Sequence, residues 1–352
     1  MKDSWNWLVI SPFVLTLILL LTICAVFSGC YTITQGITML SYLNKAIPLE
    51  QVKDEEFVRA VNDIRNFAVN ELGLAESLNY TKYVEIDRDY LAAVVSASSK
   101  TSFKRYEWSY PVVGKLPYKG FFSVEHARRE KEKLEKKGYD VWMRGVEAFS
   151  TLGWFKDPLY SYMRKYTPSR LADLIIHELV HATVFLKGHA KFNEEIAEFI
   201  GTEGSRLYIE NRYGLDSAEY RQMLAAKEDS RNFVIFLQGL IAELEELYSS
   251  NQSADDTLKQ KELIINNAKE RFKIEYDSRF SSGNFREFSD LEINNAYLDL
   301  FRLYHDEDNF YADLFDRSGR DLRSFVTALK TLTDKTAGDN PRSKLENALL
   351  QH

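Results

Sequence analysis

The sequence predicts an α+β fold, with a small mixed β-sheet followed by a mostly helical second half. Between residues 80 and 125, short runs of β-branched and aromatic residues alternate with turn residues, as is typical of short strands. Beyond Gly188 the chain consists almost entirely of charged segments with apolar residues at helical spacing. The formal net charge of -7 argues against a nucleic-acid partner, because phosphate binding needs a basic surface.

The first 30 residues predict export to a membrane. Residues 7–27 are almost entirely apolar and lead to Ser28-Gly29-Cys30, an arrangement typical of a lipoprotein signal that is cut before Cys30, which then carries the lipid. An uncleaved signal anchor is the alternative, since about 20 apolar residues can span a bilayer. We therefore expect residues 1–29 to be a signal peptide or membrane anchor, and residues 30–352 a single domain on the exported side of a bacterial cell-envelope membrane.

Residues 30–166 are predicted to form an α/β part. Its first helix spans about 53–73, where apolar side chains recur at helical spacing before Gly73. A strongly charged, solvent-exposed helix is expected at about 123–138. The strands expected in this part lie near residues 83–86, 91–95, 108–113 and 139–144.

Residues 167–352 are predicted to be helical. Thr167 offers a capping hydroxyl and Pro168 suits the first helical position, so a helix begins there and is expected to end at Gly188. Further helices are expected at about 193–213, 217–249, 255–274, 291–304 and 320–333.

The segment His177-Glu178-Leu179-Val180-His181 is the strongest functional signal in the chain. Residues four apart on a helix share one face, so both imidazoles can bind one zinc ion. Glu178 then lies beside the open coordination position, where a general base can take a proton from the zinc-activated water. The sequence therefore predicts one Zn²⁺ held by His177 and His181, with Glu178 as a catalytic residue.

A catalytic zinc ion needs a third protein ligand, and Glu194 is the candidate. It follows Asn193 at the start of the next predicted helix, while Glu195 points about 100° away on an ideal helix. Glu198 lies one turn later on the face of Glu194, where it could accept the second ring N–H of His177. The short spacing from His181 requires a tight loop, which Gly188 permits.

A structural interpretation of the same residues stays open. Two histidines on an apolar helix can be buried and hydrogen-bonded without a metal, or the metal site can be structural or idle in a lipoprotein that binds a partner. The nearby carboxylates weigh against a site without a cation, because buried charge is costly unless it is compensated.

The chain resembles a family of bacterial zinc aminopeptidases, envelope proteins often predicted as lipoproteins. The resemblance rests on the metal-binding helix, residues 192–204, and the segments 110–114, 117–120, 138–141, 150–158 and 294–296. It implies a zincin-like metallopeptidase with a peptide substrate, although family members often carry a cysteine pair where Ser109 and Lys115 stand here.

The remaining catalytic roles are assigned less directly. In related zinc peptidases the second oxyanion donor is commonly a tyrosine or histidine, and Tyr304 is our choice ahead of Tyr297 and His305. Two residues, Glu195 and Glu147, remain candidates for the acidic group that would hold the substrate's amine. Residues 150–153 are either an edge strand that pairs with the peptide or an ordinary buried turn.

Overall fold

The computed structural model describes residues 38, 41–42, 44–110, 114–146, 157–302, 309–332 and 340–350. None of the helices that it describes combines the length and apolar character needed to cross a bilayer. Several predictions concern residues outside the described ones, namely the signal segment 1–29, lipidation at Cys30, the edge strand 150–153, Glu147, Tyr304 and His305.

The α+β prediction is confirmed, but the described strands form three small sheets instead of one mixed sheet. The largest is antiparallel, with β3 (Ala92–Ser99) between β6 (Tyr118–Phe121) and β7 (Tyr139–Val146). In the second, β2 (Lys82–Val84) pairs antiparallel with β1 (Ile47–Pro48) and parallel with β8 (Leu159–Tyr160). The third is a hairpin of β4 (Trp108–Tyr110) and β5 (Gly114–Leu116).

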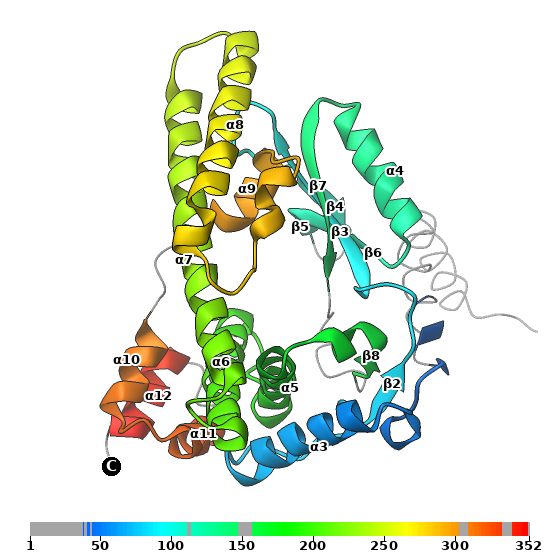
Figure 1. Ribbon diagram of the computed structural model, residues 1–352, viewed down its shortest axis with the longest axis vertical. Coiled ribbons are helices and arrows are strands. Elements are labelled where there is room, and N and C mark those ends of the chain that lie inside the picture. Colours follow the sequence, from blue (N-terminus) through cyan, green and yellow to red (C-terminus); the bar gives the residue numbers. More distant parts are fainter. Residues whose placement is uncertain are drawn as a thin grey trace, which may run out of the picture.

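The β6-β3-β7 sheet is packed between two helices. The charged helix α4 (Val124–Glu135) lies beside it at one side of the molecule and α9 (Asn295–Arg302) at the other (Figure 1). A buried polar network joins α9 and α8 to the sheet: the backbone N–H of Asn295 donates to Asp140 at 3.0 Å, and Lys261 forms an ion pair with the same carboxylate. The network fixes the helical half against the strands, because a buried charge is stable only when it is paired.

A long helical hairpin forms one edge of the molecule. It consists of α7 (Ala218–Ser249) and α8 (Ala254–Arg279), which lie side by side in Figure 1. A short 3₁₀ segment, Arg286–Asp290, leads to α9. The shared core is rich in phenylalanine, including Phe233, Phe236, Phe272 and Phe288.

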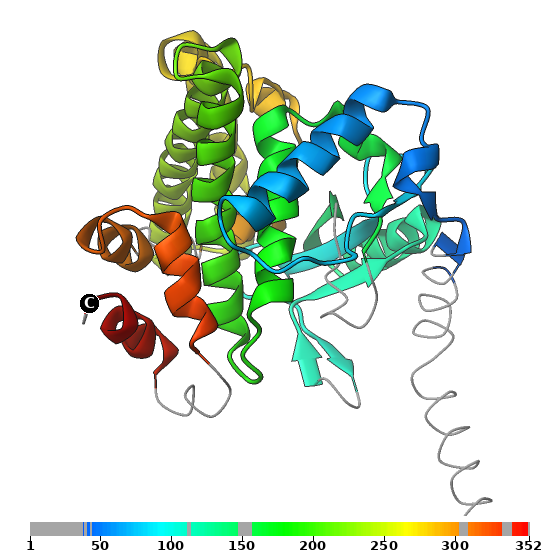
Figure 2. The ribbon, with the colours of Figure 1, turned by 90° about the horizontal axis from the view of Figure 1, so that it is seen from below.

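A separate core surrounds the predicted metal-binding helix, α5 (Pro168–Thr183). Helix α6 (Ala190–Tyr213) packs along α5, and α3 (Glu55–Asn70) crosses them (Figure 2). Helix α5 ends at Thr183 instead of Gly188, because Val184 already has extended backbone angles. Gly188 lies in the connecting loop at φ +84°.

The C-terminal helices cover α6 on the side away from the sheets (Figure 1). They are α10 (Phe310–Arg317), α11 (Leu322–Lys330) and α12 (Pro341–Leu350). The sequence predicts only α11 among them. Helices α10 and α12, with eight and ten residues, were not predicted.

Candidate metal centre

Helix α5 presents its two histidines on one face. The helix begins as predicted, with the Thr167 hydroxyl accepting a hydrogen bond from the Arg170 backbone N–H at 3.3 Å. One turn separates His177 from His181, and their Nε2 atoms lie 3.2 Å apart with the ring planes at 81°. Both nitrogens therefore point to the same region of space.

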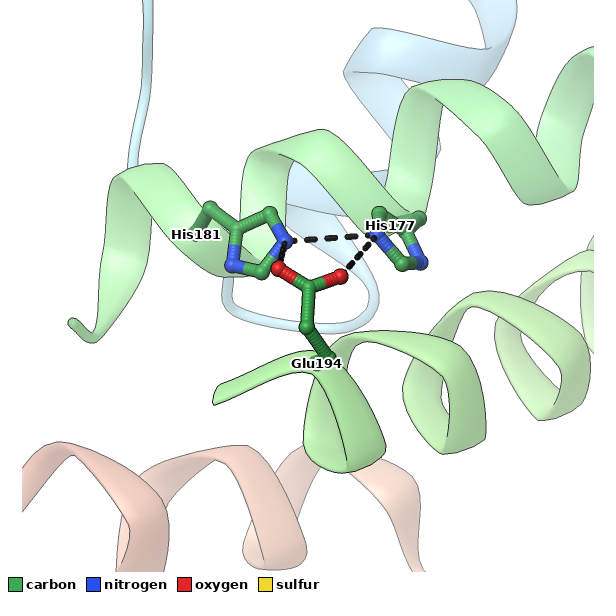
Figure 3. A group of neighbouring side chains, drawn as sticks. All are labelled: His177, His181 and Glu194. Carbon is green, nitrogen blue, oxygen red and sulfur yellow. Dashed lines mark hydrogen bonds and ion pairs between the residues drawn. The ribbon is translucent and has the colours of Figure 1, made fainter. Parts of the chain in front are cut away.

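Glu194 from the first turns of α6 completes this group (Figure 3). Its carboxylate oxygens lie 3.7 Å from Nε2 of His177 and 3.5 Å from Nε2 of His181. One ligand atom from each of the three residues lies within 4.8 Å of the others, so the structure brings together the three predicted ligands. The Glu194 side chain is 60% exposed, and this side of the group is open to solvent.

The tight loop before α6 is held by Asn193. Its buried side-chain amide donates to the carbonyl of Leu186 and accepts from the backbone N–H of Leu186, both at 2.9 Å. This pair of bonds closes the loop, and Gly188 supplies the left-handed backbone angle that the turn needs. The sequence predicts a tight loop here, whereas the role of Asn193 becomes visible only in the structure.

Two glycines allow α5 and α6 to approach closely. A Cβ atom added at Gly201 would lie 3.2 Å from the Cβ of His177 and 3.2 Å from the carbonyl oxygen of Asp173. One at Gly204 would lie 3.1 Å from Ile176. This close packing of the two helices fixes the distance between Glu194 on α6 and the two imidazoles on α5.

The charge states of the group suit metal binding. Burial, and then the neighbouring His181, lower the pKa of His177 to about 4. Burial also lowers the pKa of His181, against the opposing charge of Glu194. Both imidazoles are therefore neutral near pH 7 and keep a lone pair for a cation.

Glu178 follows His177 on α5, and the charge of the candidate ligand Glu194 acts on it. Its side chain is buried, and burial followed by the charges of Asp157 and Glu194 raises its pKa to about 7. A carboxyl group with this pKa can both accept and release a proton near neutral pH.

Two other predicted roles, those of Glu198 and Glu195, have different outcomes. Glu198 is exposed one turn after Glu194, and its charge contributes after burial to raising the pKa of Asp173 to about 6; its contact with His177 stays a prediction. Glu195 accepts a hydrogen bond from Tyr311 at 3.0 Å and pairs with Arg342 at 2.8 Å. Because Arg342 already compensates its charge, the structure does not favour Glu195 as the amine-binding group.

The structure does not favour Tyr297 as an oxyanion donor. Its ring packs against Trp142 and Phe288 in the core of the α7–α8 hairpin, separate from the core around α5. Asp157 and Tyr80, by contrast, lie near Glu178 and were not expected there. No local motif indicates them, because the parallel pairing of β2 with β8 brings them together.

An α+β protein with two histidines and a glutamate on adjacent helices presents a candidate metal centre with a buried carboxyl group beside it. The family model described as "Putative aminopeptidase" matches residues 38–345. The chain belongs to this family, and membership suggests a peptidase with a peptide substrate. A comparison with curated proteins and one with solved structures give no match.

Proposed function

We propose that this protein is a zinc-dependent peptidase of the glutamate type, with a zincin-like arrangement of α5 and α6. The spacing of the three candidate ligand atoms is the observation that carries the proposal. With Zn–ligand distances of about 2.0–2.1 Å and tetrahedral angles, two ligand atoms lie about 3.3 Å apart. The two imidazole nitrogens are 3.2 Å apart, and each lies within 3.7 Å of an oxygen of Glu194, His177 of one oxygen and His181 of the other. One ligand atom from each residue lies within 4.8 Å of the others, so a small movement of the Glu194 side chain brings the group to zinc spacing.

The donor set also fits zinc chemically. Two neutral imidazoles and one carboxylate are the ligands of many catalytic zinc sites, which keep a further position open for water or substrate. The exposed side of Glu194 leaves room for that position. A structural zinc site, in contrast, is normally closed by four protein ligands.

When bound, zinc supplies a Lewis acid that polarises the scissile carbonyl and lowers the pKa of a coordinated water. Glu178 is the residue to which we assign proton transfer, from the attacking water to the leaving amine. Its burial and its pKa of about 7 match this double task. We keep Tyr304 as the proposed oxyanion donor and Glu198 as the proposed hydrogen-bond partner of His177.

Metal analysis of the purified protein, combined with the variant Glu178→Gln, tests the proposal. We expect about one zinc ion per chain in both proteins, and a turnover of peptide reporters that is lower by roughly 10²–10⁴-fold in the variant. Glu246→Gln, which changes an exposed glutamate on α7, is the matched control and should keep full turnover. A zinc-free wild-type protein, or equal turnover in wild type and Glu178→Gln, would contradict the proposal.

We further propose that residues 30–352 form one domain attached to a bacterial envelope membrane through a lipid on Cys30, with the site on the exported side. The apolar segment that ends at Ser28-Gly29-Cys30 supports this. Mass spectrometry of the mature N-terminus is the test. A mature chain that begins with a lipid-modified Cys30 is expected, whereas an intact Met1 would indicate a signal anchor instead.

A further inference from the structure

Three consecutive residues near the start of α6 face three different neighbours. Asn193 bonds to the connecting loop, Glu194 faces the two histidines, and Glu195 faces the C-terminal helices. Successive side chains of a helix project about 100° apart, so one helical turn supplies all three directions. The candidate metal ligand therefore lies between two residues that are each bonded to another part of the protein.

The start of α6 needs such contacts because it is not capped. Its N-cap residue, His189, gives no capping hydrogen bond from its side chain in this described stretch of the chain. The first N–H groups of a helix have no partner within the helix, and without a cap the first turn is weakly held. Contacts from other elements are then needed to hold the turns that carry Glu194.

Glu195 is bonded to two of the C-terminal helices, on the side of α6 that faces away from α5 (Figures 1 and 3). The hydroxyl of Tyr311 on α10 donates to Oε2 at 3.0 Å. The guanidinium of Arg342 on α12 contacts both carboxylate oxygens, Oε2 at 3.2 Å through Nε and Oε1 at 2.8 Å through a terminal nitrogen. Such a bidentate pair fixes the orientation of the carboxylate as well as its distance.

The two partners of Glu195 are themselves held in place. The guanidinium carbon of Arg342 lies 5.2 Å from the ring centres of both Phe310 and Tyr311, which favours a cation. Burial, followed by the charge of Glu195, raises the pKa of Tyr311, so its hydroxyl keeps its proton and donates it to the carboxylate. Lys191 lies 3.7 Å from the same carboxylate, but its side chain is 88% exposed, so water screens this pair.

We propose that Arg342 and Tyr311 are positioning residues for the metal centre. They hold Glu195, and through it the helical turn that directs Glu194 at the two imidazoles. The inference rests on the proposed zinc site and adds to it two residues from the C-terminal helices. The effect passes through the backbone, since neighbouring residues of one helical turn move together.

Zinc competition titrations of single variants separate positioning from charge. Through charge alone, Arg342→Gln would bind zinc more tightly because it removes a positive charge, and Glu195→Gln would bind zinc less tightly. Positioning predicts weaker binding in both variants, by about tenfold, the lower end of the roughly 10- to 100-fold loss for residues that orient a ligand directly. Tyr311→Phe changes no charge and should weaken zinc binding by a smaller factor.

Arg317→Gln is the matched control. Arg317 on α10 pairs with Glu346 on α12 at 2.8 Å, so this variant breaks another bond between the C-terminal helices and should keep the zinc affinity of the wild type. Because Arg342 acts through Glu195, the double variant Arg342→Gln/Glu195→Gln should bind zinc no more weakly than the weaker single variant. With cobalt(II) in place of zinc, the visible absorption bands report the ligand geometry, and they should change in Arg342→Gln but not in Arg317→Gln.

Unchanged or tighter zinc binding by Arg342→Gln, or an equal loss in Arg317→Gln, would overturn the inference and leave the zinc site standing. Losses that add in the double variant, or cobalt bands that stay the same in Arg342→Gln, would also overturn it. If Arg342→Gln does not fold, Tyr311→Phe decides, and an unchanged zinc affinity of that variant counts against the inference. A folded wild-type protein that binds no zinc would instead refute the proposed function.

Discussion

Gly201→Ala tests the idea that close contact between α5 and α6 sets the metal-binding geometry. The added Cβ would lie 2.8 Å from Oδ1 of Asp173, 3.2 Å from its carbonyl oxygen and 3.2 Å from the Cβ of His177. The aspartate oxygen can rotate away, but the carbonyl and the Cβ belong to the neighbouring helix and can move only with it. Overpacking of this kind costs about 1–3 kcal/mol.

Gly239→Ala on α7 provides the matched control, since a Cβ there would meet nothing within 4 Å. Alanine in place of glycine gains about 1 kcal/mol of helix propensity in both variants. We therefore expect Gly239→Ala to raise the free energy of unfolding by about 1 kcal/mol, and Gly201→Ala to lie about 1–3 kcal/mol below the control.

Urea denaturation of the metal-free proteins gives the two free energies of unfolding, and zinc competition titrations give the metal affinities. Only Gly201→Ala should weaken zinc binding, because a shift of α6 by a few tenths of an ångström moves Glu194 relative to both imidazoles. Equal stabilisation by the two substitutions, with unchanged zinc affinity, would show that the helices are not in the close contact described.

Three further variants test neighbouring residues. Glu194→Gln should weaken zinc binding by more than the roughly 10- to 100-fold expected for Glu198→Gln, and equal losses in a competition titration would contradict the assignment of Glu194 as a ligand. Asn193→Ala removes both bonds to Leu186 and should cost about 1–3 kcal/mol in urea denaturation, with weaker zinc binding; an unaltered unfolding midpoint would argue against its role in the loop. Folded metal-free protein keeps the Asp173 proton up to about pH 6, whereas the unfolded chain releases it near pH 3.9, so this group makes stability fall as pH rises between these values. Asp173→Asn should remove that fall, on the order of 1–3 kcal/mol, and a pH profile identical to that of the wild type would refute the assignment.

The candidate ligands could be predicted from the sequence because their signals are local. His177 and His181 are one helical turn apart, and the start of α5 is marked by Thr167 and Pro168, which the structure confirms. The predicted end of α5 was wrong. Gly188 is the most conspicuous helix stop in the sequence, but the chain already leaves the helix at Val184. There the Thr183 hydroxyl accepts from the backbone N–H of Ala75, a contact across 108 residues that no local pattern shows.

The two residues near Glu178, Tyr80 and Asp157, could not be predicted for the same reason. Tyr80 and Asp157 meet because β2 and β8 pair in parallel, with Tyr83 opposite Leu159. These strands have three and two residues, too few to show a periodicity that indicates their partner. Of the two candidates for the amine-binding group, Glu147 lies outside the described residues, and Glu195 shows its charge in the sequence but not its partner Arg342.

The contacts of Tyr311 and Arg342 with Glu195 depend on residues that are synthesised late. Arg342 is joined to the chain 147 residues after Glu195, and Tyr311 is joined 116 residues after it. Throughout that interval on the ribosome, Glu195 in the first turns of α6 lacks these two partners. The nascent chain therefore carries its histidine pair long before the turn that bears Glu194 has all its partners, and the candidate metal centre is completed only late in synthesis.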